Sequence, residues 1–119
     1  MKYMIMMFGD AATAMETKSR EWLVEMTTFM RGLNQELADN GELVVAEGLA
    51  DSVRAKTVTL VDGAPVVTDG PFAEAKESLI GFWIVDVEDE ARVLAIGGRI
   101  VAYSERLEIR PVLGGPPEL

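Results

Sequence analysis

The segment VTDGPFAEAKESLIGFWIVDV, residues 67–87, joins a turn, a cluster of charges and a long apolar run. The apolar run has the β-branched and aromatic content of a strand. Asp69-Gly70-Pro71 predicts a turn, because Pro71 fixes its own φ and disfavours the α region for Gly70. Pro71 also suits the first position of a short helical turn, which Asp69 would cap. Phe72 would then anchor this turn in the core.

The charges that follow this turn allow two interpretations. Glu74, Lys76 and Glu77 stand close together between apolar strands. They form either a solvated surface cluster or the polar edge of a ligand site. The second interpretation rests on the exposed N–H groups of a helix start, which favour anions.

The rest of the chain alternates between patterns typical of strands and of helices. Residues 19–39 have apolar side chains at helical spacing and end at Asn40-Gly41. A shorter helix, 88–98, is acidic at its start and is expected to close at Gly97-Gly98. Asp62-Gly63 is a strong hairpin signal. The expected strands are 2–8, 42–50, 79–87 and 106–112, with a hairpin over 54–70 and a loop over 9–18.

This order predicts an α+β fold, a ferredoxin-like sandwich. One antiparallel sheet would carry both helices on one face, with the β-hairpin as an insertion. The other face of the sheet would need cover, and a second protomer of a homodimer is expected to supply it. We assign one domain to residues 1–113 and a C-terminal tail to 114–119.

Composition excludes several function classes. The 119 residues include 20 acidic and 11 basic ones, giving a net charge of -9. This charge argues against direct binding to nucleic acid or to anionic membranes. The first apolar run, at Tyr3 to Phe8, is too short for a signal peptide, and no run is long enough to cross a membrane. A cytoplasmic protein is expected.

The chain has no cysteine and no histidine. Thiol nucleophiles, Ser-His-Asp chemistry and histidine-ligated or thiolate-ligated metals are therefore excluded. We expect no transition metal and no cofactor. Acid–base chemistry would depend on carboxylates, lysine, tyrosine or bound water.

The segment from residue 67 to residue 87 closely resembles the signature of the YCII-related family in its DGPF-type branch. Three further segments resemble that family: MKYMIMMFGD (1–10), NQELADNGELVVAEGL (34–49) and LEIRPV (107–112). The resemblance thus covers nearly the whole chain. It implies a dimeric α+β barrel, in which two ferredoxin-like protomers pack sheet to sheet around a cleft.

The resemblance also implies candidate site residues. Those that match the branch motif are Asp69, Gly70, Pro71, Phe72, Glu74, Lys76 and Glu77, and Arg110 matches the basic residue of the last strand. The His-Asp pair discussed for the wider family cannot be carried over, because this chain has no histidine. Some relatives are associated with extracytoplasmic-function sigma factors, which implies a regulatory context.

Three hypotheses for the function follow. The first is a homodimer that binds a small molecule of unknown identity, as a sensor or regulator, with Glu74, Lys76 and Arg110 as polar contacts. The second is an enzyme in which a carboxylate, Asp69 or Glu74, acts as general acid or base in an apolar cleft between the sheets. The third is an interaction module that docks a partner such as a sigma factor.

Overall fold

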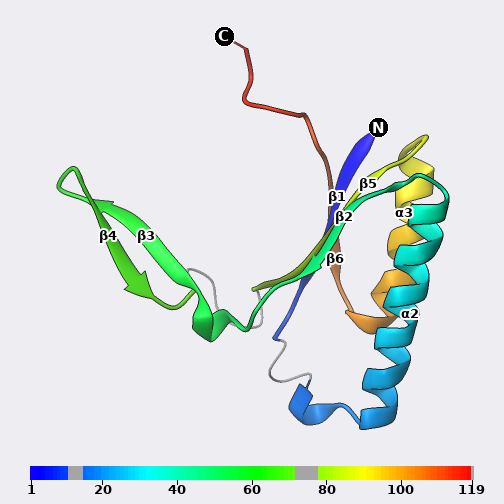
Figure 1. Cartoon of the computed structure of the whole chain (residues 1–119). Coiled ribbons are helices and arrows are strands. Elements are labelled where there is room, and N and C mark those ends of the chain that lie inside the picture. Colours follow the sequence, from blue (N-terminus) through cyan, green and yellow to red (C-terminus); the bar gives the residue numbers. More distant parts are fainter. Residues whose placement is uncertain (11–14, 72–77, 119) are drawn as a thin grey trace.

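The computed structural model describes residues 1–10, 15–71 and 78–118. It confirms the expected α+β, ferredoxin-like fold with an inserted hairpin (Figure 1). The described elements are β1 (Lys2–Phe8), α2 (Arg20–Asp39), β2 (Leu43–Gly48), β3 (Lys56–Val61), β4 (Ala64–Asp69), β5 (Leu79–Asp86), α3 (Glu90–Ile100) and β6 (Leu107–Pro111), with 3₁₀ turns η1 (Ser52–Arg54) and η3 (Val101–Tyr103).

A four-stranded sheet forms the centre of the molecule. Its strand order is β2-β5-β1-β6, and every neighbouring pair is antiparallel. The two central strands are therefore far apart in the sequence, and each helix connects strands that are not adjacent. Helices α2 and α3 lie on the same face of the sheet (Figure 1).

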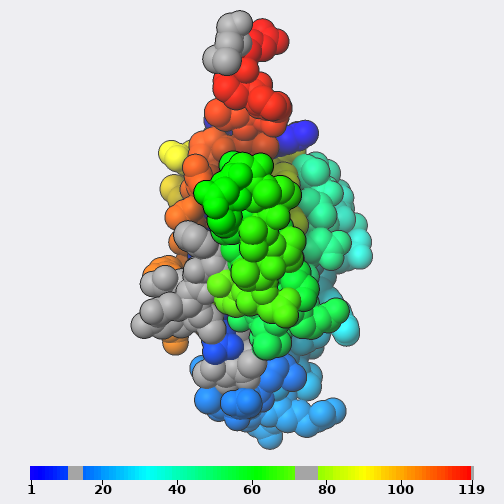
Figure 2. All heavy atoms as spheres, turned by 90° about the vertical axis from the view of Figure 1, so that its left-hand side faces the viewer, coloured from blue at the N-terminus to red at the C-terminus, as the bar shows by residue number. Residues whose placement is uncertain are grey.

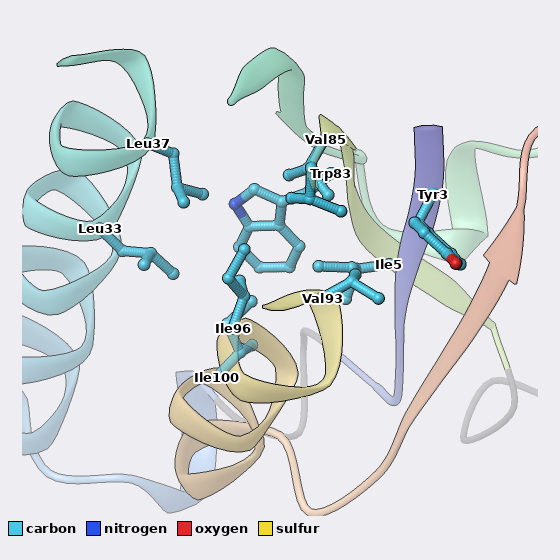
Figure 3. Packing of buried hydrophobic residues seen from close by; sticks show 10 residues of the cluster. Tyr3, Ile5, Leu33, Leu37, Trp83, Val85, Val93, Ile96 and Ile100 are labelled. Carbon is cyan, nitrogen blue, oxygen red and sulfur yellow. The ribbon is translucent and has the colours of Figure 1, made fainter. Parts of the chain in front are cut away.

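The core lies between this face and the two helices. Tyr3 and Ile5 are buried on β1, and their register partners on β5 are Val85 and Trp83. Figure 3 shows Leu33 and Leu37 pointing from α2 towards the indole ring. The indole N–H of Trp83 donates to Asn34 Oδ1 at 2.8 Å, so the one polar atom of this ring has a partner. The other core residues are Val87, Val93, Ile96 and Ile100.

Local signals explain where α2 begins and ends. Ser19 is the N-cap, and its side chain accepts a hydrogen bond from the backbone N–H of Trp22 at 3.1 Å. Beyond the C-cap Asn40, Gly41 has φ 72°, the left-handed conformation that favours glycine. Residues 15–17, inside the segment expected to be a loop, form a helical turn instead.

The predicted end of the second helix was wrong. Gly97 and Gly98 lie inside α3, which continues to Ile100. A Cβ atom on Gly97 would lie 2.9 Å from Ile109 Cδ1, so this glycine lets α3 approach β6 closely. The helix continues because Ile96 and Ile100 are buried in the core, and this packing outweighs the low helix propensity of two glycines.

The opposite face of the sheet, the open face, carries the alternate residues of each strand. Met4 pairs with Ile84 and Met6 with Phe82, and all four are half-buried. No helix in the described ranges packs on this face (Figure 1). The open face thus consists of an apolar centre, with Val45 and Glu47 on β2 and Glu108 and Arg110 on β6 as its flanks.

Strands β3 and β4 form a separate two-stranded sheet, which we call the hairpin arm (residues 56–69). The turn residues Asp62 and Gly63 have φ 50° and 80°, as a tight two-residue hairpin turn requires. The arm leaves the sheet on the side opposite the helices (Figure 1). Seen from that side, its atoms lie in front of the sheet (Figure 2).

Candidate functional site

A hollow among the described residues lies at the root of the hairpin arm. It has a volume of about 760 Å³ and is widely open to solvent. One end of the main sheet and the first half of β3 form its walls. It is lined by Phe8, Leu49, Ala50, Asp51, Ser52, Arg54, Ala55, Lys56, Thr57, Val58, Thr59, Pro71, Ser78 and Leu79.

The 3₁₀ turn η1 brings two cationic side chains to this hollow. Asp51 caps the turn, and its Oδ1 accepts from the backbone N–H of Val53 at 2.9 Å. The turn then ends at Arg54, and Lys56 follows as the first residue of β3. Within the described part of the chain, the Arg54 guanidinium has no hydrogen-bond or ion-pair partner. This cation is therefore available to an anionic group.

Apolar side chains from the main sheet form the opposite wall. Phe8 ends β1, Leu79 begins β5, and the two are register partners. Leu49 follows β2 and donates its backbone N–H to the carbonyl of Ile80 at 2.9 Å, which keeps it beside the same sheet end. The guanidinium carbon of Arg106 lies 5.9 Å from the centre of the Phe8 ring, within the range of a cation–π contact.

The first residues of the predicted motif lie at the arm root. Gly70 donates its backbone N–H to the carbonyl of Ala55 at 2.9 Å, and its own carbonyl accepts from the Thr57 hydroxyl at 2.7 Å. Its φ is 102°, a backbone conformation that residues other than glycine rarely adopt. Pro71 then lines the hollow. The sequence Asp-Gly-Pro therefore fixes how the arm rejoins the sheet.

Asp69 is the last residue of β4 and forms an ion pair with Lys56, its register partner on β3. Its side chain is 84% exposed. The carboxylate thus closes the base of the arm. Within the described residues it does not lie in the apolar cleft that acid–base catalysis would need, and its catalytic role remains a prediction.

The remaining predicted residues divide into two groups. Phe72, Glu74, Lys76 and Glu77 lie outside the described residues, and so does the helical turn expected there. Arg110 is described, but it is on the open face of the sheet, beside Met4, and does not line the hollow. The structure therefore brings Asp69, Gly70 and Pro71 together at the arm root and leaves Arg110 on a different surface.

Sequence reasoning did not single out the cations of the hollow or its apolar wall. Arg54 and Lys56 lie two residues apart just before the hairpin, in a chain with few cations, and this spacing was the available signal. Nothing in the sequence places Phe8 and Leu79 beside them. Those contacts depend on how β1 and β5 pair and on where the arm leaves the sheet.

A second, shallower hollow lies at the other end of the sheet, between the end of α2 and the start of α3. Three of its four charged side chains already have partners among the described residues, the exception being Glu88. Arg92 binds Glu42 through two hydrogen bonds of 2.8 Å, and the N-terminal ammonium lies 2.9 Å from Asp86 Oδ1. The hydrogen bond from Arg92 holds the pKa of Glu42 below its ordinary value. These ion pairs join neighbouring elements of the fold, and their presence is explained without a ligand.

Across residues 1–10, 15–71 and 78–118, no group of three or more carboxylates is arranged to hold a metal ion. In the same ranges, no helix is long and apolar enough to cross a membrane.

The hollow at the arm root is lined by both apolar and cationic side chains. This combination suits the binding of a small molecule.

Comparison with known proteins agrees with this fold. The chain matches the model of the YCII-related domain over residues 1–114. It is also similar to an uncharacterised protein of Rhizobium meliloti (strain 1021), with 28% identity over 86 residues, which cover 72% of this chain and 68% of the relative. The match to the family model extends from β1 through β6 and includes the hairpin arm and its root. The chain therefore belongs to the YCII-related family.

Proposed function

We propose that the protein is a cytoplasmic homodimer that binds a small molecule at the root of its hairpin arm. The observation that carries this proposal is the hollow itself, which is lined both by the cationic Arg54 and Lys56 and by the apolar Phe8, Leu49 and Leu79. The bound molecule signals through the dimer, in keeping with a sensor or regulatory protein.

The chemistry of the two walls indicates the class of ligand. A molecule with an apolar body would cover the aromatic and aliphatic wall and remove it from water. A carboxylate or phosphate on that molecule would pair with Arg54, whose guanidinium has no other partner among the described residues. We therefore expect an anionic, partly apolar ligand of modest size.

The homodimer is supported by the open face of the sheet. Its central residues Met4, Met6, Phe82 and Ile84 are apolar, and no described helix covers them. A sheet of this kind is stable when a second layer packs on its exposed face. A second protomer supplies that layer without any further chain.

The proposal is tested with a series of straight-chain carboxylates of increasing length and the alcohols of the same lengths. We expect the carboxylates to raise the melting temperature and the alcohols to have a much smaller effect. In Arg54→Gln the difference between the two series should disappear. Arg31→Gln, an exposed arginine on α2, is the matched control and should behave as the wild type. Equal binding of both series by the wild type would contradict the assignment of Arg54.

An interaction module is a second candidate, because the exposed hairpin arm provides a surface for a protein partner. Co-purification of a sigma factor from cells, lost on substitution of the arm residues, would favour this function. Catalysis by Asp69 or Glu74 is less well supported, since Asp69 is exposed and paired with Lys56. The enzyme hypothesis would be supported if the protein turned over a bound compound and Glu74→Gln abolished this turnover with the fold intact.

A further inference from the structure

The hairpin arm exposes large aliphatic side chains, and the most exposed of them lie together on one face. Val58 is the register partner of Val67, and Leu60 that of Pro65, so these four residues lie together on the same face of the arm. The exposed fractions of Val58, Leu60 and Val67 are 63%, 75% and 62%. None of the three belongs to the core of the main sheet. The arm thus presents an apolar surface that the rest of the described chain does not cover.

A hairpin with this surface is not stable by itself. Two-stranded hairpins without a packed face are marginal in water. The arm and the C-terminal tail both project from the main sheet, so the molecule is unusually extended (Figure 1). Its radius of gyration is 16.5 Å, whereas a compact domain of this length has about 13.5 Å. A second surface that covers the arm would remove both the exposed aliphatic area and the instability.

A second copy of this chain would need the arm as well as the open face to form an interface of ordinary size. Ten residues of the open face are available for contact: Lys2, Met4, Met6, Val45, Glu47, Phe82, Ile84, Asp86, Glu108 and Arg110. A stable interface uses about 20–30 residues on each side, which is more than the open face provides. The face of the arm that carries Val58 adds six residues, Lys56, Val58, Leu60, Pro65, Val67 and Asp69, so a second copy needs the arm as well as the open face to approach this range.

Charge also favours a second copy over a basic partner. The arm carries Lys56, Asp62 and Asp69, a net charge of -1, and the open face carries Lys2, Glu47, Asp86, Glu108 and Arg110, again -1. Most of the chain's net charge of -9 therefore lies elsewhere. Two copies can bring these surfaces together without strong repulsion, whereas a basic partner would be drawn to the acidic surfaces outside them.

From these observations we infer that the hairpin arm is a dimerisation arm, whose Val58, Leu60 and Val67 face packs against a second copy of this chain. This inference rests on the homodimer of the proposed function and specifies which part of the chain holds it together. Because Lys56 to Thr59 line the hollow as well as begin the arm, the second copy also fixes the cationic wall of the ligand site. Dimerisation and ligand binding are then coupled.

The test compares Leu60→Glu with Thr68→Glu. Both substitutions place a glutamate in the arm, but Thr68 is exposed on the opposite face and does not line the hollow. Leu60→Glu should raise the dimer dissociation constant by about 100-fold or more, because the interface loses a buried aliphatic side chain and must take up a charge. Thr68→Glu should change it by less than about 5-fold. Sedimentation equilibrium gives both constants, and far-UV circular dichroism checks that each variant is folded.

Hydrogen exchange provides an independent measurement. The backbone amides of the arm should be protected in the wild-type dimer and should exchange rapidly in Leu60→Glu, while the amides of β1 and β5 stay protected in both. A wild type that is monomeric would overturn the homodimer of the proposed function. A wild-type dimer that Leu60→Glu leaves intact, or that both variants weaken equally, would overturn the arm inference and leave the homodimer standing.

Discussion

At the scale of single residues, the Arg92–Glu42 pair is a well-defined, bidentate polar contact within the described part of the chain. The Glu42 side chain is 15% exposed, and both of its oxygens accept from one guanidinium. This geometry joins the end of α2 to the start of α3. Bidentate pairs hold their partners in one orientation and are stronger than single contacts.

We predict that Glu42→Gln lowers the free energy of unfolding at pH 7 by about 1 kcal/mol. Because Arg92 lowers the pKa of Glu42 from its ordinary value of 4.5, the contribution is fully present above that value. It is lost as the pH falls through the lowered pKa. Urea denaturation at a series of pH values measures this, with Glu88→Gln as the exposed control. A difference that persists undiminished at pH 2 would contradict the assignment.

At the scale of elements, substitution of the two glycines of α3 distinguishes the effect of helix propensity on stability from the effect of packing. Gly98 has open space where a Cβ would lie, whereas at Gly97 that atom would meet Ile109 Cδ1 at 2.9 Å. We predict that Gly98→Ala raises the free energy of unfolding by about 0.5–1 kcal/mol. Gly97→Ala should give no such gain, because the contact with Ile109 offsets it. Chemical denaturation of both variants tests this, and equal gains would show that α3 and β6 are not in close contact.

The start of α2 depends on a single cap. Ser19→Ala removes the acceptor for the Trp22 N–H and should lower the free energy of unfolding by about 1 kcal/mol. Ser19→Asp should retain the stability, since a carboxylate accepts the same bond and favours the positive end of the helix. Thermal denaturation distinguishes the two. A loss of the same size in both variants would indicate that packing of Trp22, and not the cap, sets the start of the helix.

At the scale of the whole molecule, the prediction concerns assembly. The open sheet face and the hairpin arm lie on the same side of the chain (Figure 1). We predict a dimer that persists on dilution to about 1 μM and that depends little on salt, because the contact is largely apolar. Analytical ultracentrifugation at low and high ionic strength measures this. Dissociation by salt would point instead to an interface held by charges.

The sequence alone was sufficient for the order of strands and helices, the hairpin turn and the limits of α2. These features are determined locally, by the alternation of apolar residues, by Asp62-Gly63 and by Ser19 and Gly41. The ferredoxin-like strand order was also predictable, because few topologies accommodate that sequence of elements. Composition was equally informative, since a chain without histidine and cysteine lacks whole classes of catalytic and metal chemistry.

Tertiary structure alone decided the rest. Gly97 looked like a helix end, but α3 continues past it because Ile96 and Ile100 pack in the core. Arg110 looked like part of the same site as the Asp69 motif, but it lies on the open sheet face. Phe8 and Arg54 come together at one hollow only because β5 pairs with β1 and the arm leaves the sheet beside their ends. Contacts of this kind join residues distant in the sequence, and local pattern carries no information about them.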